Sequence, residues 1–419
     1  MRAACSIFLL CLLSMAGASQ DTLQKVVGDR TNSAAQQQKP YIILISIDGF
    51  RYDYAEKHGA KQLLSFVKNG VRAASMIPGY PTLTFPNHYS IVTGLYPAHH
   101  GLSSNYFYSP RRQQFYSMKD TNTVRDGSWY GGTPLWVLAE QQQMLSASFF
   151  WVGSEAAIRG VRPTYYYRFY DKYPMDRRIQ AVVDWLSLPP STRPHFITFY
   201  ISDVDHAGHD YGPDAVETKM AVQRVDSIIY RLVAAVGKTG LPVNFIVVGD
   251  HGMTRVDNEN GMRLPSVIDS SKFFIPRGFE LVALYARNKE DVSPVYQQLL
   301  KNAKDYKVYL KENMPSRLHY SDKDDRAGTI GDILLIPKWP KIFSSRKDNA
   351  DPGAHGFDPF LLKDMHTIFF AWGPAFKKGM RIPSFENVNV YPVIAKILGL
   401  HYEEKIDGSG TVAQQVLKK

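Results

Sequence analysis

Residues Tyr41–Ile47 read YIILISI, and this run stops at Asp48-Gly49. A nearly continuous run of apolar and β-branched residues is typical of a strand buried on both faces of a sheet. The same pattern recurs at Phe196–Ile201, Val243–Val248 and 367–371, and each run ends in turn or polar residues. The four runs therefore predict four buried strands.

Helical patterns lie between these strands. Residues 215–236 carry apolar side chains at helical spacing, and residues 387–398 are a second candidate with Pro392 near its start. Strands that alternate with helices predict an α/β fold, with a mainly parallel central sheet and helices on both faces. Ligands of such sheets bind beyond the carboxyl ends of the strands.

The composition is that of an ordinary globular protein. The chain has 419 residues, of which 44% are hydrophobic and 21% charged, and this excludes a disordered chain, a collagen-like chain and a coiled coil. We expect residues 40–419 to form a single domain, with an insertion at about 256–350 where charged and loop residues are more frequent. The net charge of +10 is scattered without a run of five basic residues, so no nucleic-acid partner is expected.

The N-terminus has the pattern of a secretory signal peptide. Arg2 precedes an apolar run at 3–13, and Ala16-Gly17-Ala18 fits a cleavage site, which predicts a signal over residues 1–18. The apolar run is shorter than the roughly 20 residues that span a bilayer, so no transmembrane segment is expected in the mature chain. The polar, Gln-rich residues 19–39 are interpreted as a flexible linker.

Both cysteines, Cys5 and Cys11, lie inside the predicted signal. The mature chain would then be exported without a disulfide, and no thiolate could act as nucleophile or metal ligand. This combination favours a bacterial periplasm.

Aspartate and histidine side chains follow three of the predicted strands, and another histidine stands between two glycines. The candidate metal ligands are Asp48, Asp205, His209, Asp250, His251 and His355. Asp203 and His206 compete with Asp205 and His209. Taken singly, these residues are also typical of caps, turns and solvated acidic loops.

Taken together, the six residues offer oxygen and nitrogen ligands without sulfur, which suits two zinc ions that each keep an open position. Two ions about 3.5–4 Å apart can stabilise both the attacking and the leaving oxygen of a phosphoryl transfer. Manganese or iron could occupy the same ligands.

The candidate nucleophile lies in the stretch 81–89. Pro86 has a φ suited to the first turn of a helix, which would place Thr84 at the helix N-terminus, where free N–H groups favour an anion. An ordinary N-cap threonine is the alternative. A metal ion at its oxygen would let the hydroxyl lose its proton near neutral pH.

These residues together resemble the nucleotide pyrophosphatase/phosphodiesterase family of the alkaline phosphatase superfamily. The match runs roughly from 41 to 400, and its motifs are Thr82-Leu83-Thr84-Phe85-Pro86-Asn87-His88-Tyr89, Thr93-Gly94-Leu95-Tyr96-Pro97, Asp205-x-x-Gly208-His209, Asp250-His251-Gly252-Met253 and His355-Gly356-Phe357. The resemblance implies an alkaline-phosphatase-like fold and a catalytic phosphodiesterase domain.

The resemblance also implies roles for single residues. Thr84 looks like the nucleophile that forms a phospho-threonine, and Asn105 like the amide that donates to a phosphoryl oxygen. One zinc ion would bind Asp205, His209 and His355, and the other would bind Asp48, Asp250, His251 and the Thr84 hydroxyl.

Three aromatic residues, Phe85, Phe169 and Tyr200, resemble those that line the substrate slot of the family. Core packing is the alternative for all three. Asp203-Val204 and Val152 depart from the family pattern near this slot, which leaves the substrate open. The cysteine-rich modules of animal members are absent, so a compact bacterial member is expected.

The resulting hypothesis is a two-zinc phosphodiesterase. It would hydrolyse phosphate diesters, such as ATP or dinucleotides, and release a nucleoside monophosphate. A phosphomonoesterase or a lysophospholipid phosphodiesterase on the same metal core is the alternative. A binding protein on a decayed enzyme fold is a third interpretation, which the intact ligand set disfavours.

Overall fold

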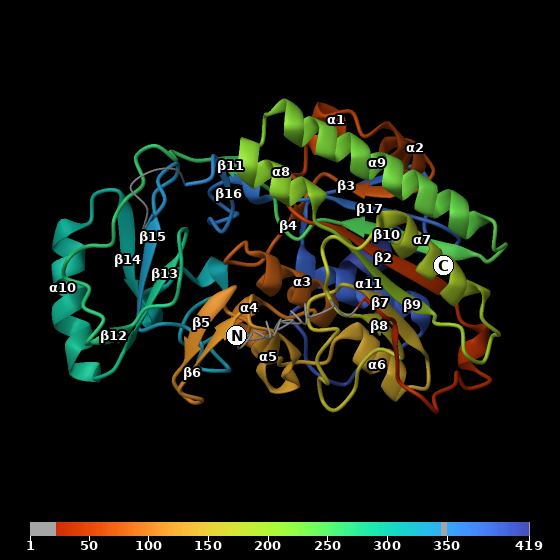
Figure 1. The fold of residues 1–419 in the computed structure, drawn as a ribbon, viewed down its shortest axis with the longest axis horizontal. Coiled ribbons are helices and arrows are strands. Elements are labelled where there is room, and N and C mark those ends of the chain that lie inside the picture. Colours follow the sequence, from red (N-terminus) through yellow and green to blue (C-terminus); the bar gives the residue numbers. More distant parts are fainter. Residues whose placement is uncertain (1–21, 345–349, 419) are drawn as a thin grey trace, which may run out of the picture.

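A computed structural model describes residues 22–344 and 350–418. Its centre is a nine-stranded sheet in the order β1-β8-β7-β9-β2-β10-β17-β3-β18 (Figure 1). The strands are β1 (Lys25–Val26), β2 (Tyr41–Ile47), β3 (Val71–Ala73), β7 (Ser146–Phe149), β8 (Tyr165–Tyr167), β9 (Phe196–Ile201), β10 (Val243–Val248), β17 (Phe369–Trp372) and β18 (Met380–Ile382).

The predicted α/β class and the mainly parallel sheet are confirmed. The strands β8, β7, β9, β2 and β10 run parallel to one another, whereas β17 is antiparallel to both β10 and β3. The four apolar runs are the strands β2, β9, β10 and β17, and they are consecutive neighbours at the middle of the sheet, in the order β9-β2-β10-β17.

Helices cover both faces of the sheet, as predicted (Figure 1). One face carries α2 (Lys61–Lys68), α7 (Met175–Ser187) and α9 (Val216–Gly237), and the other carries α3 (Thr84–Thr93), α6 (Leu135–Gln141) and α11 (Val390–Leu398). Side chains of β2 alternate between the two cores, because successive residues of a strand point to opposite faces.

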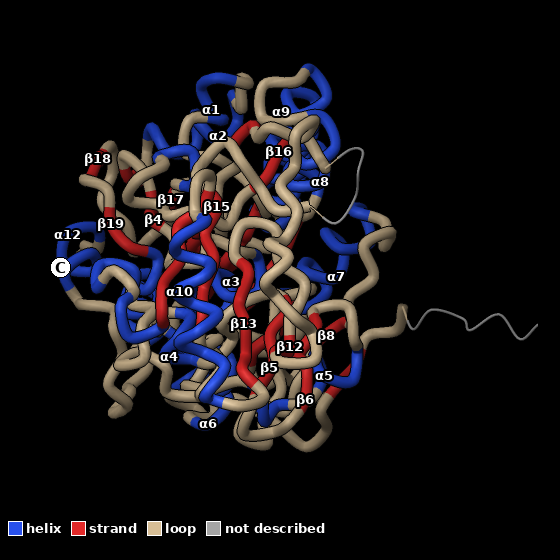
Figure 2. Tube along the Cα trace, turned by 90° about the vertical axis from the view of Figure 1, so that its left-hand side faces the viewer, coloured by secondary structure: helices blue, strands red, loops and turns tan. Residues whose placement is uncertain are grey.

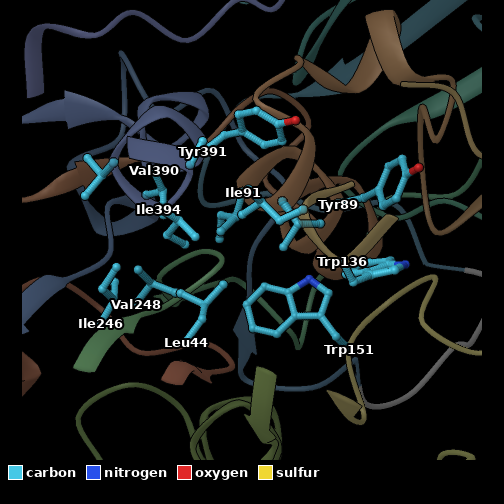
Figure 3. Close-up of a cluster of buried hydrophobic side chains, with 14 of the residues drawn as sticks. Leu44, Tyr89, Ile91, Trp136, Trp151, Ile246, Val248, Val390, Tyr391 and Ile394 are labelled. Carbon is cyan, nitrogen blue, oxygen red and sulfur yellow. The ribbon is translucent and has the colours of Figure 1, made fainter. Parts of the chain in front are cut away.

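Ile43 and Ile45 belong to the core under α9, while Ile42 and Leu44 belong to the core under α3 and α11. Figure 3 shows the second of these cores, in which Leu44 lies near Ile246 and Val248 of β10 and faces Ile91 of α3. The core thus fixes α3, whose first residue is Thr84, against the middle of the sheet.

The remaining helices and small sheets surround this framework. They are α1 (Tyr54–Lys57), α4 (Pro97–His100), α5 (Thr121–Arg125), α8 (Asp203–Tyr211), α12 (Thr411–Val416), β4 (Met76–Ile77) with β19 (Phe385–Glu386), β5 (Tyr106–Ser109) with β6 (Gln114–Ser117), and β11 (Thr254–Arg255) with β16 (Gly353–Ala354). No helix among the described residues is both long and apolar enough to cross a membrane.

The stretch expected as an insertion contains a separate four-stranded sheet in the order β12-β13-β15-β14. Its elements are β12 (Phe273–Phe274), β13 (Val282–Ala286), α10 (Val292–Asn302), β14 (Tyr306–Leu310) and β15 (Ile333–Pro337). Figure 2 faces this sheet and α10. It has its own core around Leu299 and Ile333, and it joins the main body where Phe274 stacks on Tyr108 at 4.0 Å.

The interpretation of residues 19–39 as a flexible linker is wrong for 22–39. Lys25 and Val26 form β1, which pairs with Tyr166 and Tyr165 at the edge of the central sheet. Asn32 is 3% exposed, and its side chain is bonded to three backbone groups of the main body. The polar composition of this segment was a misleading signal for a linker, because polar side chains such as that of Asn32 form hydrogen bonds with buried backbone groups. The predicted signal peptide, residues 1–18, and residues 19–21 lie outside the described residues.

Candidate active site

The predicted site residues meet at the carboxyl ends of the three central strands. Asp48 follows β2, Asp250 and His251 follow β10, and α8 begins just beyond β9. Because β9, β2 and β10 are adjacent and parallel, their carboxyl ends lie side by side at one edge of the sheet. His355 reaches this edge from the segment after β16, which contacts α8.

Two overlapping groups of side chains could each hold a metal ion. In one, single ligand atoms of Asp48, Asp250 and His251 all lie within 4.8 Å of one another, and in the other the same holds for Asp205, His251 and His355. His209 adjoins the second group: its Nε2 is 3.1 Å from Nε2 of His355 and 3.5 Å from Oδ1 of Asp205.

His251 is therefore shared between groups that the sequence treated as separate. Its ring stacks on that of His355 with 3.5 Å between ring centroids. All six candidate ligands are thus brought together. The competitors Asp203 and His206 are engaged elsewhere, in ion pairs with Arg224 and Asp171.

The histidines are oriented by backbone carbonyls. Nδ1 of His209, His251 and His355 lies 2.9, 2.9 and 2.8 Å from the carbonyl oxygens of Gly353, Gly252 and Thr82. A carbonyl can only accept, so Nδ1 carries the proton and donates. Nε2 of each ring then faces the site, which is the usual arrangement of metal-binding histidines.

The carboxylates leave unused oxygens at the same place. Oδ1 of Asp48, Oδ1 of Asp205 and Oδ2 of Asp250 are buried atoms that accept no hydrogen bond from any described residue. A bound cation would satisfy these inward-facing oxygen and nitrogen atoms, because buried acceptors are normally satisfied. The residues therefore fit two divalent ions that accept N and O ligands, and zinc has this preference.

The pKa shifts of Asp48 and His355 agree with a bound cation. Burial, together with the charges of Asp250 and Asp205, raises the pKa of Asp48 well above its ordinary value. Burial, together with the neighbouring His251 and His209, lowers the pKa of His355 well below its ordinary value. A bound cation would relieve both the repulsion among the carboxylates and the crowding of the imidazoles.

The candidate nucleophile faces the first group of ligands. Thr84 is the first residue of α3, and its Oγ1 lies 3.3 Å from Nε2 of His251. The helix begins there because Leu83 before it is extended, so the first N–H groups of α3 have no partner within the helix. Thr84 thus combines a half-buried hydroxyl with a helix terminus that favours an anion.

Asn105 is fixed beside this hydroxyl. The Phe85 N–H donates to Oδ1 of Asn105 at 2.9 Å, which leaves the amide NH₂ of Asn105 as a donor. Asn105 is only 8% exposed, so its orientation is determined by the first turn of α3.

The three predicted slot aromatics are placed differently from one another. The rings of Tyr200 and Phe169 are 6.1 Å apart in an edge-to-face arrangement, and Phe169 is 49% exposed. Phe85 instead packs against Tyr116, at 6.4 Å. The Tyr200 hydroxyl also donates to Oδ2 of Asp48 at 2.6 Å, a contact that the sequence did not predict.

His88 is a second residue that sequence reasoning missed. It is fully buried, its Nδ1 lies 2.9 Å from the Thr84 carbonyl and 3.3 Å from Oδ2 of Asp250, and its Nε2 contacts Oγ of Ser46. Its position four residues after Thr84, on the same face of α3, was the available signal.

Comparisons with known proteins give concordant results. The family model described as type I phosphodiesterase / nucleotide pyrophosphatase matches residues 42–358. Ectonucleotide pyrophosphatase/phosphodiesterase family member 1 of Rattus norvegicus is 35% identical over 407 residues, which cover 93% of this chain and 44% of the rat protein. An uncharacterised pyrophosphatase/phosphodiesterase of Schizosaccharomyces pombe is 33% identical, over 90% of this chain and 80% of its own length.

The chain thus spans less than half the length of the rat relative. Among solved structures, an inactive threonine-to-alanine variant of murine ectonucleotide pyrophosphatase/phosphodiesterase 5, in complex with AMP, superimposes with a TM-score of 0.84. That likeness has 26% sequence identity and covers 91% of this chain and all of the murine chain.

Proposed function

Since the chain belongs to the type I phosphodiesterase / nucleotide pyrophosphatase family, we propose that it is a two-zinc phosphodiesterase that acts through a phospho-threonine. The observation that carries this proposal is the position of the Thr84 hydroxyl, 3.3 Å from His251, beside three buried carboxylate oxygens without partners. A hydroxyl at a helix N-terminus that faces an unsatisfied cation site is suited to attack phosphorus.

The residues divide between two ions. Asp48, Asp250, His251 and Thr84 would hold one, and Asp205, His209 and His355 would hold the other, with His251 close to both. Bound zinc would supply the positive charge that lowers the pKa of the Thr84 hydroxyl and stabilises negative charge on the phosphoryl and leaving oxygens.

The chain's own groups then act in two displacements. Thr84 gives its proton to water as Oγ1 forms a bond to phosphorus and the bond to the leaving oxygen breaks, and the leaving oxygen takes a proton from water. A second water then adds its oxygen to phosphorus as the bond to Oγ1 breaks, and the proton that this water loses passes to Oγ1. Each displacement inverts phosphorus, so the net result is retention.

Asn105 would orient the phosphoryl group during both steps. Its amide NH₂ can donate to a phosphoryl oxygen because its Oδ1 is already held by the Phe85 N–H. Donors fixed in advance are effective because they need no reorganisation as charge develops.

The proposed substrates are phosphate diesters and nucleotides, such as ATP or dinucleotides, with release of a nucleoside monophosphate. The murine neighbour bound to AMP supports a nucleotide, and Phe169, Tyr200 and Phe85 offer aromatic surface near the site. The alternative phosphomonoesterase would need a cation for the extra phosphate charge. Arg51 and Arg72, the candidates for that role, are engaged with Asp53 and Glu56, and this favours a diester.

We also propose export of the chain after cleavage behind Ala18, to the periplasm of a bacterium. The support is the pattern of residues 1–18 and the position of both cysteines within it. Residues 40–419, together with the docked residues 22–39, would form one catalytic domain that carries its insertion at about 256–350.

The test is a paired assay on the purified protein, with bound zinc counted by mass spectrometry. We expect about two zinc ions per chain and a higher kcat/KM for bis-p-nitrophenyl phosphate than for p-nitrophenyl phosphate. A preference for the monoester would overturn the diester assignment. No hydrolysis at full zinc occupancy would overturn the enzyme assignment and favour a binding role.

A further inference from the structure

Tyr200 and Asp48 are joined at the edge of the sheet where the candidate ligands meet. Tyr200 lies on β9 and pairs in register with Ser46 of β2, two residues before Asp48. The Tyr200 hydroxyl donates to Oδ2 of Asp48 at 2.6 Å. The contact is thus set by the pairing of the two central strands.

The Tyr200 hydroxyl gives the two oxygens of Asp48 different surroundings. Oδ2 is held by Tyr200, while Oδ1 is buried, accepts no hydrogen bond from a described residue, and lies 3.4 Å from Nε2 of His251. We propose that Tyr200 is a positioning residue for Asp48. It holds one oxygen so that the carboxylate presents the other, and only the other, to a bound zinc ion. This inference rests on the two-zinc assignment made above.

Four of the five other ligands support this interpretation, because their outward atoms are also held. Oδ1 of Asp250 accepts from the Gly49 N–H, and Nδ1 of His209, His251 and His355 donates to a backbone carbonyl. These four partners are backbone groups, whereas the partner of Asp48 is a side chain. The support of Asp48 can therefore be removed by one substitution that leaves the backbone in place.

The ring of Tyr200 has neighbours of its own. It packs edge-to-face against Phe169 at 6.1 Å and against His88 at 5.2 Å. Tyr200→Phe preserves this packing and removes only the hydroxyl, so it separates the positioning role from the aromatic role expected of the residue in the substrate slot.

The expected effect is selective for one ion. Loss of an outer-shell partner typically weakens metal binding by about 10- to 100-fold. In Tyr200→Phe we expect one of the two zinc dissociation constants, measured by competition with a chelator, to rise by about that factor while the other stays unchanged. The zinc concentration that gives half-maximal activity should rise by the same factor.

A matched control is Tyr165→Phe, which removes a tyrosine hydroxyl that donates to the Thr192 carbonyl at the edge of the same sheet. Both zinc constants should stay at wild-type values in this variant. A double-mutant cycle with Asp48→Asn supplies the second test, because Tyr200→Phe should cause no further loss once the carboxylate is gone.

Unchanged zinc dissociation constants in Tyr200→Phe would overturn the inference, and so would an equal fall in zinc affinity at both sites. A third contradicting outcome is that Tyr200→Phe weakens zinc binding as much in the Asp48→Asn background as it does in the wild type. A lower melting temperature of metal-free Tyr200→Phe than of metal-free Tyr165→Phe, without a selective zinc effect, would assign the hydroxyl to general stability. Failure of the proposed function is distinguishable, since the wild-type protein would then bind no zinc pair or hydrolyse no diester.

Discussion

Oγ1 of Thr84 lies 3.3 Å from Nε2 of His251, although 167 residues separate the two along the chain. The contact joins the first turn of α3 to the end of β10, and it places a hydroxyl against a ring whose lone pair faces the site. The chemistry proposed for the protein depends on this juxtaposition more than on any other.

Removal of that hydroxyl should stop turnover without loss of the metal site. We expect Thr84→Ala to reduce kcat by at least about 10³-fold, because the attacking atom is lost. Bound zinc should stay close to the wild-type content, since the other ligands remain. Thr84→Ser, which keeps a hydroxyl, is the matched control and should retain activity. A Thr84→Ala protein with wild-type kcat would exclude Thr84 as the nucleophile.

The amide of Asn105 should contribute to rate rather than to metal binding. Removal of one fixed donor to a developing negative charge typically costs about 10²–10³ in kcat, and we expect Asn105→Ala to fall in this range. Steady-state kinetics and zinc analysis are measured together. Asn122→Ala, at an exposed asparagine, is the control. If Asn105→Ala lost zinc and kept its kcat per bound metal, the amide would have a structural role.

Metal ions should stabilise the fold. Three carboxylates with unpartnered oxygens lie in one buried site, so a bound cation removes their repulsion. A ligand at 100 times its dissociation constant adds about 2.7 kcal/mol to the free energy of unfolding. We therefore expect zinc to raise the Tm of chelator-treated protein, and Asp250→Asn to reduce this rise. An identical Tm with and without zinc would contradict a site built from these residues.

The buried ring of His100 should make the protein less stable at acidic pH, independently of the metal site. Burial lowers the pKa of His100 to about 3, and its Nδ1 accepts from the Leu102 N–H. The unfolded chain binds a proton below about pH 6.5, whereas the native ring does not until about pH 3, so stability falls as pH falls within this window. The slope for one such group is at most about 1.4 kcal/mol per pH unit.

Urea unfolding at several pH values between 7 and 4.5 measures this effect. His100→Gln should lose less unfolding free energy on acidification than the wild type, and comparison of the two proteins cancels the contributions of other groups. The exposed His401 provides a control as His401→Gln. Equal slopes in wild type and His100→Gln would show that the ring does not remain neutral in the native state.

Asn32 should be necessary for stability although it lies in a polar stretch. Its Nδ2 donates to the carbonyls of Pro190 and Arg193, and its Oδ1 accepts from the Leu145 N–H. Asn32→Ala leaves these buried groups unpaired, and we expect a loss of about 2–4 kcal/mol in the free energy of unfolding. Chemical denaturation measures it, with Asn122→Ala as the control. A loss below about 0.5 kcal/mol in the free energy of unfolding would mean that the contacts of Asn32 with the main body contribute little to stability.

The framework of the fold and the residue types of the site could be predicted from local sequence patterns. Continuous apolar runs such as Tyr41–Ile47 can be buried only between two covered faces, so they predicted the central parallel strands. Aspartate and histidine directly after those strands predicted where ligands gather, because parallel strands end at a common edge. The helix that begins at Thr84 followed from Pro86 and the apolar residues after it.

The pairing of side chains across the site could not be predicted before the fold was known. The bond from Tyr200 to Asp48 and the docking of Asn32 join segments more than 100 residues apart, and the sharing of His251 between two groups of ligands joins it to Asp48 and His355, which are also more than 100 residues away. Local patterns report the period and burial of one segment, but they carry no information on which distant segment lies opposite. Strand order and register supply that information, and they exist only once the whole core has packed.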